Sequence, residues 1–484
     1  MKYTYKLLIL TVFAAFAFYS CDDMDDSLNV PSKLEVQNFI WKGLNLYYLW
    51  QEDSPDLADD RFATQEQLNT FLIPYTNPLT LFNHLRVDPS IDRFSVLVDD
   101  YEYLENLFKG VAKSNGMEFT LRLKPGSDTE VFGTVNYVIP NSDAANKNLT
   151  RGMVFYAIDG QALNVNNYRD LIASTTYTLN FADYNDGAIT PNGQSVELIK
   201  TELTENPIYL TKVIETNNQK IGYLMYNGFT ANYDLQLNDA FGTLKTAGVT
   251  DLVLDLRYNG GGSVLTATRL ASMITGQFND QLFAKQQWNS KIQEYFEENN
   301  PSQLVNNFTN KIGNTNINSL NLSRVYVLTT GGTASASELV INGLKPYIQV
   351  IQIGTKTVGK NVGSITLYDS PTFNKKDVNP RHKYAMQPIV IKTINKDGFG
   401  DYQNGIAPDV VLPEFAGNLG VLGNENEPLL SAALGLITND AKFTPQTNKK
   451  WSKEFKYSKS LLKFGNDMYI DNSNLKGFEN INLK

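Results

Sequence analysis

Apolar and polar positions follow different patterns in different parts of the chain, and the longest pattern runs from about residue 205 to 440. Apolar runs typical of buried strands, such as "TDLVLDLR" and "RVYVLTT", are followed by stretches with apolar residues at helical spacing, such as "VLTATRLASMI" and "ASELVINGLKP". Strands that alternate with helices usually form a parallel sheet covered by those helices. We therefore predict an α/β core over 205–440.

The part of the chain before this core divides into two further regions. Residues 31–107 place Leu34, Phe39 and Leu44 at roughly helical spacing, which predicts a small helical N-terminal domain whose aromatic residues belong to its core. Residues 108–200 instead alternate apolar and polar residues in short segments such as "GMEFTLRLK" and "FGTVNYVIP". This alternation predicts strands, interrupted by one helix at "NNYRDLIAST".

Two polar segments lack both patterns. Residues 279–322 are rich in Asn and Gln and lie between two predicted core strands, so we expect a lid or a long loop there. Residues 441–484 are rich in Lys and Asn with interspersed aromatic residues. They form a C-terminal extension whose role the pattern does not indicate.

The first thirty residues have the pattern of an export signal. Lys2 and Lys6 precede the apolar run "LLILTVFAAFAFYS", which is short for a membrane span and typical of a signal-peptide core. Because the run ends at Cys21, it resembles a bacterial lipoprotein signal, with a signal peptide at 1–20 and lipid attachment at Cys21. The acidic run "DDMDD" lies in a tether at 21–30. It resembles the export signal of surface lipoproteins in Bacteroidetes, which implies a cell-envelope protein anchored by lipid to the outer membrane.

Composition narrows the function mainly by exclusion. A chain of 484 residues is long for a single core and predicts two or three domains. The formal net charge of −9, with no Lys/Arg-rich run, provides no basic surface for nucleic acid. The chain has one cysteine and no cluster of His, Asp and Glu at ligand spacing, so we expect no internal disulfide, no metal site and no cofactor.

Two glycine-rich stretches follow predicted core strands. The first, "YNGGGS", contains Gly260, Gly261 and Gly262; it lacks the spacing of a phosphate-binding loop, but such glycines let a backbone N–H approach a ligand closely. The second, "GGTASASE", contains Ser335 and Ser337 at the start of a helix. A serine there can simply cap the helix, or it can be a nucleophile beside N–H groups that stabilise an oxyanion.

A serine nucleophile needs a base, and histidine, the usual one, is scarce. The chain has only His84 and His382, neither at an obvious strand end, so a structural role is the simpler interpretation for both. A lysine can replace histidine when burial disfavours its charged form. The stretch "GTKTVGKNVGS" offers Lys356 and Lys360.

These stretches, together with "NGIAPDVVLP" downstream, resemble the S41 family of serine peptidases, the C-terminal processing or tail-specific proteases. Ser335 and Lys360 lie 25 residues apart, which matches the family's separation of nucleophile and base. This separation selects Ser335 over Ser337 and Lys360 over Lys356. The resemblance also implies a crotonase/ClpP-like α/β architecture for the core.

The resemblance assigns a role to each site residue. Ser335 would attack the scissile carbonyl and Lys360 would take its proton, while the backbone N–H of Ala336 and of one of the three glycines would hold the oxyanion. Glu338 would support the site, although an acid in the first helical turn is also favoured by the helix dipole. Many members carry a glutamine four positions after the lysine, where this chain has Ser364. Either the shorter hydroxyl orients the lysine amine, directly or through water, or another residue does.

The run "VIPNSDAANKNLTRGMVFYAIDGQAL" resembles a PDZ domain, which implies a peptide-binding domain inserted at 108–200. The loop "SNGMEF" departs from the carboxylate-binding signature of such domains. The predicted architecture is therefore an α/β multidomain protein with a peptidase core, a PDZ-like domain and a helical N-terminal domain.

Three functions are consistent with these residues. The leading one is a Ser/Lys endopeptidase that captures an extended polypeptide near its C-terminus. The second is a surface lipoprotein that keeps the scaffold and binds peptides or other ligands without hydrolysis. The third is a tricorn-like Ser/His hydrolase, which would require His84 or His382 to reach Ser335.

Overall fold

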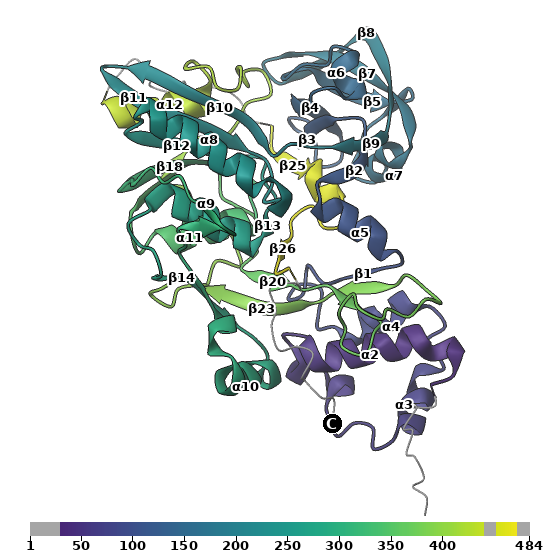
Figure 1. Ribbon diagram of the computed structural model, residues 1–484. Helices are drawn as coiled ribbons and strands as arrows, with labels where there is room; N and C mark the ends of the chain where they lie inside the picture. The colour runs from purple at the N-terminus through teal and green to yellow at the C-terminus, as the bar shows by residue number, and fades with distance from the viewer. Residues whose placement is uncertain (1–29, 440–451, 472–484) are drawn as a thin grey trace, which may run out of the picture.

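The computed structural model describes residues 30–439 and 452–471. The predicted signal peptide, Cys21 and nearly all of the acidic tether lie outside these residues. A helical N-terminal region, a β-rich module and an α/β core follow one another along the chain, and the C-terminal residues return between the module and the core (Figure 1). Among the described residues, no helix combines the length and the apolar character needed to cross a membrane.

A central sheet organises the core. In spatial order its strands are β10 (Ile208–Thr216), β11 (Gln219–Tyr226), β12 (Asp251–Asp255), β18 (Arg324–Thr329), β19 (Gln349–Gly354) and β24 (Val410–Val411). The neighbours from β11 to β24 are parallel, and β10 is antiparallel to β11. The parallel α/β core predicted from the alternating pattern is thus confirmed.

Helices cover both faces of the central sheet. They are α8 (Asp234–Ala247), α9 (Val264–Thr275), α11 (Ala336–Leu344) and α12 (Pro428–Thr438). Along β12, Leu252 and Leu254 pack in the cluster that contains residues of α8, α9 and α11, whereas Val253 packs in the cluster that contains residues of α12. Because both faces are buried, the strand is a continuous apolar run in the sequence.

A second sheet lies below the central sheet in Figure 1. Its strands, in spatial order, are β13 (Gly262–Ser263), β26 (Met468–Tyr469), β20 (Val362–Ser364), β23 (Ile389–Ile394), β14 (Leu282–Gln287) and β15 (Val305–Asn307). This sheet joins segments far apart in the sequence. Its strand β26, from the end of the described chain, lies between β13 and β20.

The prediction of a lid or long loop at residues 279–322 was wrong. The segment contains β14, β15, helix α10 (Ser290–Asn299) and a small hairpin, β16 (Lys311–Ile312) with β17 (Thr315–Asn316). Many of its apolar side chains, including Phe283 and Phe296, are buried in the main core. Its polar side chains make structural bonds, as where Asn289 donates to the carbonyl of Leu46 at 2.9 Å. Residues 279–322 are therefore a packed part of the core in spite of their polar composition.

The N-terminal region is helical, as predicted. Its helices are α2 (Glu35–Tyr47), α3 (Gln65–Leu72), α4 (Pro78–Leu85) and α5 (Tyr101–Phe108). Phe39 and Leu44 of α2 are buried in the core cluster, as expected for aromatic and aliphatic residues at helical spacing. The region contacts the rest of the chain through a three-stranded sheet of β1 (Val96–Val98), β22 (Ala385–Gln387) and β21 (Leu367–Tyr368).

Residues 111–204 form the β-rich module, with the strands and the helix that the alternation predicts. Its elements are β2 (Val111–Ser114), β3 (Met117–Leu123), β4 (Val131–Val138), α6 (Asp143–Asn146), β5 (Val154–Ile158), β6 (Gln161–Ala162), α7 (Tyr168–Ala173), β7 (Thr176–Asn185), β8 (Ala188–Ile199) and β9 (Thr201–Thr204). The main sheet has the order β3-β4-β5-β7-β8, and β2 pairs with β9. The module has its own apolar core, which is separate from the main core and contains Phe119, Phe155 and Leu179.

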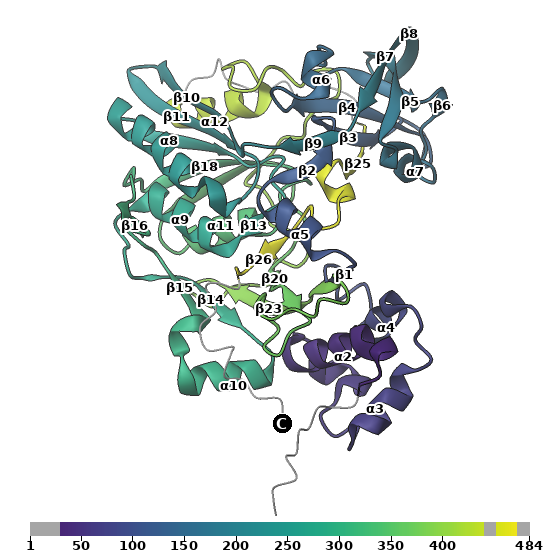
Figure 2. The same ribbon diagram turned by 45° about the vertical axis from the view of Figure 1, so that its right-hand side comes forward.

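Residues 452–471 are called the C-terminal segment from here on. Strand β25 (Glu454–Tyr457) is added to the edge of the module's sheet beside β3, and β26 belongs to the second sheet of the core. A 3-10 turn, η7 (Lys459–Leu461), lies between them. The segment, yellow in Figure 2, therefore connects the module to the core.

Candidate active site

Ser335 lies at the junction between the central sheet and α11, where it is the N-cap residue of the helix. Its backbone has a φ of 65° and a ψ of −117°, which costs a non-glycine residue about 1–3 kcal/mol. The side chain is fully buried, and its Oγ is without a hydrogen-bond partner among the described residues. A strained strand-to-helix turn with an unpaired hydroxyl is the arrangement of a nucleophile elbow, more than of a plain helix cap.

Glu338 joins the serine to the lysine-bearing loop. Its buried carboxylate accepts hydrogen bonds from the backbone N–H of Ser335 at 2.7 Å, of Lys360 at 2.8 Å and of Gly359 at 2.7 Å. Burial raises the pKa of the Glu338 carboxyl, and these hydrogen bonds partly offset that effect. The glutamate thus fixes the positions of both predicted catalytic residues through their backbones.

The triple glycine meets the serine elbow, as the oxyanion prediction requires. A methyl group placed on Gly261 would lie 2.6 Å from the Cβ of Ser335 and 3.0 Å from the N of Ala336, so only glycine allows this approach. The N–H of Gly261 donates to Asn259 Oδ1 at 2.9 Å. Because Asn259 occupies this donor, Gly260, Gly262 and Ala336 are the better candidates for holding an oxyanion.

Asn259 was not predicted as a site residue, yet it ties the two glycine-rich stretches together. Its carbonyl oxygen accepts hydrogen bonds from the N–H of Ala334 and from Ser337 Oγ, both at 3.1 Å. Ser337, the serine not selected by spacing, therefore has a structural contact. The only sequence signal for Asn259 was its position directly before the glycines.

Lys360 is fully buried beside a residue that sequence reasoning missed. Its Nζ donates to Asp467 Oδ1 at 2.8 Å and lies 4.7 Å from the ring centroid of Phe94. Asp467 belongs to the C-terminal segment and comes 107 residues after the lysine. No local motif could have indicated this contact, because it depends on how the chain returns to the site.

Ser364 does not make the contact expected of it. Its Oγ donates to the carbonyl of Met468 at 3.3 Å, and Asp467 takes the place at the lysine amine that the resemblance implied for residue 364. Ser364 lies on β20, directly beside β26, which explains why its hydroxyl faces the C-terminal segment.

The two histidines pair with aspartates away from the serine. His84 Nε2 lies 2.9 Å from Asp56, and His382 Nε2 lies 2.9 Å from Asp369. Neither histidine contacts Ser335 in the described part of the chain, so the Ser/His alternative has no geometric support. The described residues also contain no group of three or more His, Cys, Asp and Glu side chains suited to hold a metal ion.

A buried network of charges lies at the carboxyl end of β12. Arg257, fully buried, pairs with Asp255, Glu414 and Glu427, and Arg151 of the module reaches Glu414 at 2.6 Å. Desolvation opposes ionisation of Glu414, but the charges of Arg151 and Arg257 outweigh it and lower the pKa to about 2. The network thus joins the module to the core next to the glycine loop.

Known families match two parts of this chain. "Peptidase family S41" matches residues 220–412, which include Ser335, Lys360 and the triple glycine, and "Peptidase S41 N-terminal domain" matches residues 35–96. The chain belongs to peptidase family S41. The family assignment expected from the sequence motifs is therefore confirmed.

Two curated relatives extend the S41 assignment along the chain. A carboxyl-terminal-processing protease of Picosynechococcus sp. is 27% identical over 251 residues, which are 52% of this chain and 53% of that protein. A chloroplastic C-terminal processing peptidase of Tetradesmus obliquus is 25% identical over 411 residues, or 81% and 77% of the two chains. The chain thus spans about half the length of the first relative and three quarters of the second.

A solved structure shares the S41 fold over most of the chain. It is the crystal structure of a protein assigned to the S41 proteases, from Bacteroides fragilis NCTC 9343. It is 28% identical, with a TM-score of 0.63, and the match covers 83% of this chain and 97% of that one. The likeness supports the S41 fold, with its N-terminal domain and mixed α/β sheets, in this molecule.

Proposed function

We propose that this S41 member is a serine endopeptidase in which Ser335 is the nucleophile and Lys360 is the general base. The observation that carries the proposal is the Glu338 carboxylate, which binds the backbone of both residues and so holds a strained, unpaired serine next to the lysine loop. A capping role alone explains neither the strain at Ser335 nor the burial of Lys360.

The proposed reaction uses only groups of this chain and water. Ser335 Oγ attacks the scissile carbonyl, neutral Lys360 accepts the hydroxyl proton, and the lysine then returns that proton to the leaving amine. The N–H groups of Ala336 and of Gly260 or Gly262 hold the negative oxygen. Water, activated by the same lysine, completes the hydrolysis of the acyl-enzyme.

The β-rich module is proposed to be PDZ-like and to take an extended polypeptide by strand addition. Its edge strand β3 and helix α7 flank the position at which β25 pairs, and such an edge offers backbone groups to any extended chain. The relatives named for C-terminal processing support a substrate bound near its C-terminus. We assign the α/β core to the crotonase/ClpP-like architecture because its motifs resemble those of the S41 family.

A peptide-binding protein without hydrolysis is the second candidate. It is favoured by one observation: the amine of Lys360 is bound to the Asp467 carboxylate, so the base is paired in this structure. The two candidates share the scaffold and differ only in whether Lys360 becomes free and neutral.

We further propose that residues 1–20 are a signal peptide and that a lipid on Cys21 anchors the protein at the outer membrane. The support is the sequence pattern of Lys2, Lys6, the apolar run and Cys21. Metabolic labelling with a radioactive fatty acid tests it: the wild-type chain is labelled and Cys21→Ser is not. Labelling of Cys21→Ser to the same extent would contradict the proposal.

Cleavage of casein by the chain lacking residues 1–26 tests the peptidase. We expect Ser335→Ala to lose activity by about 10⁴-fold or more. Ser337→Ala is a matched control, because it removes the same atom two residues away on the same helix and leaves Ser335 in place. Full activity in Ser335→Ala would refute the assignment.

A further inference from the structure

The C-terminal segment occupies the two places where a peptide would have to bind. Its first strand, β25, pairs antiparallel with the module's edge strand β3, with Tyr457 opposite Thr120. The N–H of Ser458 then donates to the carbonyl of Phe119 at 2.9 Å. The pairing uses backbone groups that any extended peptide also has, so this edge is not specific to residues 454–457.

A side chain of the segment fills the space between β3 and α7. Phe455 packs against the apolar core of the module, with its ring centroid 5.3 Å from that of Tyr168 on α7. Leu461 packs against the same core. The segment thus combines strand addition with an apolar anchor, which is how an extended ligand gains both affinity and register.

The second strand of the segment lies directly over the catalytic glycines. In β26, Met468 pairs with Gly262 of β13, and Tyr469 pairs with Ser364 of β20. A methyl group on Gly260 would lie 1.9 Å from the carbonyl oxygen of Gly465, and one on Gly261 would lie 2.5 Å from that of Asp467. The glycines are therefore covered by a polypeptide backbone, as they would be by a bound substrate.

The segment also pairs the base. Asp467 contacts Lys360 Nζ, and the ring of Phe94 faces the same amine. A carboxylate and an aromatic face both stabilise an ammonium group, and an ammonium cannot accept a proton from Ser335. Ser335 Oγ is fully buried, and Ser335 is not among the residues that line the cavity beside the glycines, so a scissile carbonyl has no open path to the hydroxyl in this arrangement.

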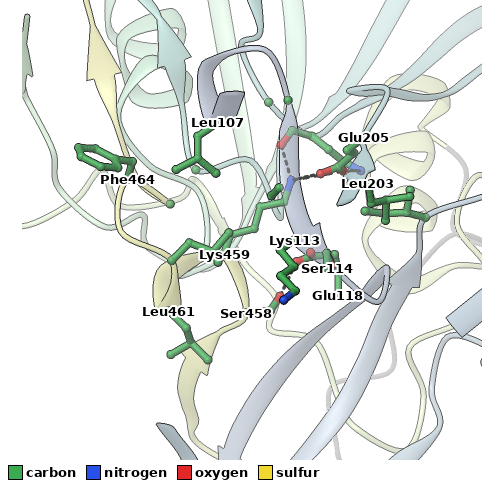
Figure 3. A pocket seen from close by; sticks show the side chains of 18 of the residues that line it. Leu107, Lys113, Ser114, Glu118, Leu203, Glu205, Ser458, Lys459, Leu461 and Phe464 are labelled. Atoms are coloured by element: carbon green, nitrogen blue, oxygen red, sulfur yellow. Dashed lines mark hydrogen bonds and ion pairs between the residues drawn. The ribbon is translucent and has the colours of Figure 1, made fainter. Parts of the chain in front are cut away.

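Between β25 and β26 the segment borders a cavity and makes polar contacts across it. A cavity of about 240 Å³ lies beside the segment, bounded by the module, by the triple glycine and by residues 458–469 (Figure 3). Lys459 donates to the carbonyl of Asn227 at 2.7 Å and pairs with Glu205 at 3.1 Å across this space. The segment is thus attached by two strands, by buried apolar side chains such as Tyr457 and Met468, and by polar contacts, with open space along one side.

We propose that residues 452–471 are an internal occupant of the peptide path, which keeps the S41 site closed until the segment is displaced. The occupant is this chain's own segment, and its competitor is an extended polypeptide that adds to β3 and continues over Gly260–Gly262. A tethered segment competes at an effective concentration of about millimolar, so a weak fit is sufficient to exclude substrate. The inference rests on the proposed function for the inhibition, whereas the occupancy can be measured without hydrolysis.

Casein cleavage by full-chain variants tests the inhibition. Asp467→Asn removes the charge that holds Lys360, and Phe455→Ala removes the anchor in the module. We expect each to raise kcat/KM for casein several-fold, and the double variant to raise it by at least about tenfold. Lys463→Ala is the control, since this exposed lysine lies in the same segment, and it leaves activity unchanged.

An opposite result would overturn the inference. If Asp467→Asn lowers kcat as Lys360→Ala does, Asp467 is a positioning partner of the base and not an inhibitor. Circular dichroism of each variant confirms that a loss of activity is not a loss of fold.

Peptide binding tests the occupancy independently of catalysis. A fluorescent synthetic peptide of residues 452–471 is titrated against Ser335→Ala and against Ser335→Ala with Phe455→Ala and Asp467→Asn. We expect binding at least about tenfold tighter to the triple variant, because its own segment leaves the path more readily. Equal binding to both proteins would contradict the inference.

The two measurements separate failure of the inference from failure of the proposed function. Peptide binding gained by the triple variant, with no casein cleavage by any variant, keeps the internal occupant and refutes the peptidase. Casein cleavage abolished by Ser335→Ala, with equal peptide binding to both proteins, keeps the peptidase and refutes the occupant.

Discussion

The two sheets of the core differ in how they are assembled, and the catalytic groups lie between them. The central sheet is built from β10 to β24 in alternation with helices, and apolar side chains bury both of its faces. The second sheet instead joins segments far apart in the sequence, and β26 completes it from the far end of the described chain. Ser335 depends on the first sheet, while the surroundings of Lys360 depend on the second. In the proposed mechanism, the central sheet thus holds the nucleophile, and one strand of the second sheet, β26, controls the environment of the base.

The largest expected effect concerns the base. In the Asp467→Asn background, we expect Lys360→Ala to lower kcat for casein by about 10³-fold or more, because the proposed mechanism has no other general base. Lys356→Ala is the matched control: this exposed lysine is four residues earlier in the same loop, and its loss should change kcat less than about twofold. Equal losses in the two variants would show that the loop, and not the amine, is needed.

The difference between the sheets predicts unequal costs of core truncation. Leu254→Ala in β12 should lower the free energy of unfolding by about 2–5 kcal/mol, because the side chain is fully buried in the central core. Met468→Ala in β26, although equally buried, should mainly increase hydrogen exchange of residues 452–471. Urea unfolding and exchange mass spectrometry measure both. A similar global destabilisation by Met468→Ala would mean that β26 is an integral strand.

The charge network beside the glycine loop predicts an acid-sensitive contact between module and core. The pKa of Glu414 is about 2 in the folded chain, below the ordinary value of 4.5, so its contribution to stability is present above pH 4.5 and is lost as the pH falls towards 2. Glu414→Gln should lower the free energy of unfolding at pH 7 by about 3 kcal/mol. It should also flatten the pH dependence below 4.5 in thermal melts. An unchanged acid profile would contradict this role.

The smallest expected effect is a pH dependence of segment docking. Burial raises the pKa of Glu118 to about 7; the charge of Lys459 lowers it, that of Glu205 raises it, and Ser458 donates to the carboxylate. For an acid with a raised pKa, stability is present at low pH and declines as the pH rises from about 4.5 to 7. After correction for the intrinsic rise of amide exchange with pH, the protection of residues 452–471 should therefore be lower at pH 8 than at pH 6 in Ser335→Ala. Glu118→Gln should reduce that difference; an equal difference in both proteins would exclude Glu118 as its source.

Local sequence patterns were sufficient to predict much of the fold, because the buried face of each helix or strand leaves a periodic apolar pattern in its own sequence. Leu252, Val253 and Leu254 form an apolar run that only a strand covered on both sides can bury, and the predicted alternation of strands and helices is observed. The segment at 279–322 was misjudged because its buried apolar side chains, such as Phe283 and Phe296, are spread among many polar residues. Its many polar residues make structural hydrogen bonds that have no periodicity.

By itself, the sequence determined the family and the parallel core and predicted the pair Ser335 and Lys360, because these depend on short-range spacing and on motifs at strand ends. Only the tertiary structure decided what surrounds that pair. The surrounding contacts join segments far apart in the chain: Asp467 instead of Ser364 meets the lysine amine, Asn259 binds Ser337, and β26 lies over Gly260–Gly262. Their residue types carry no local signal, because a carboxylate or a strand of two residues acquires its role only from the groups that the fold brings beside it.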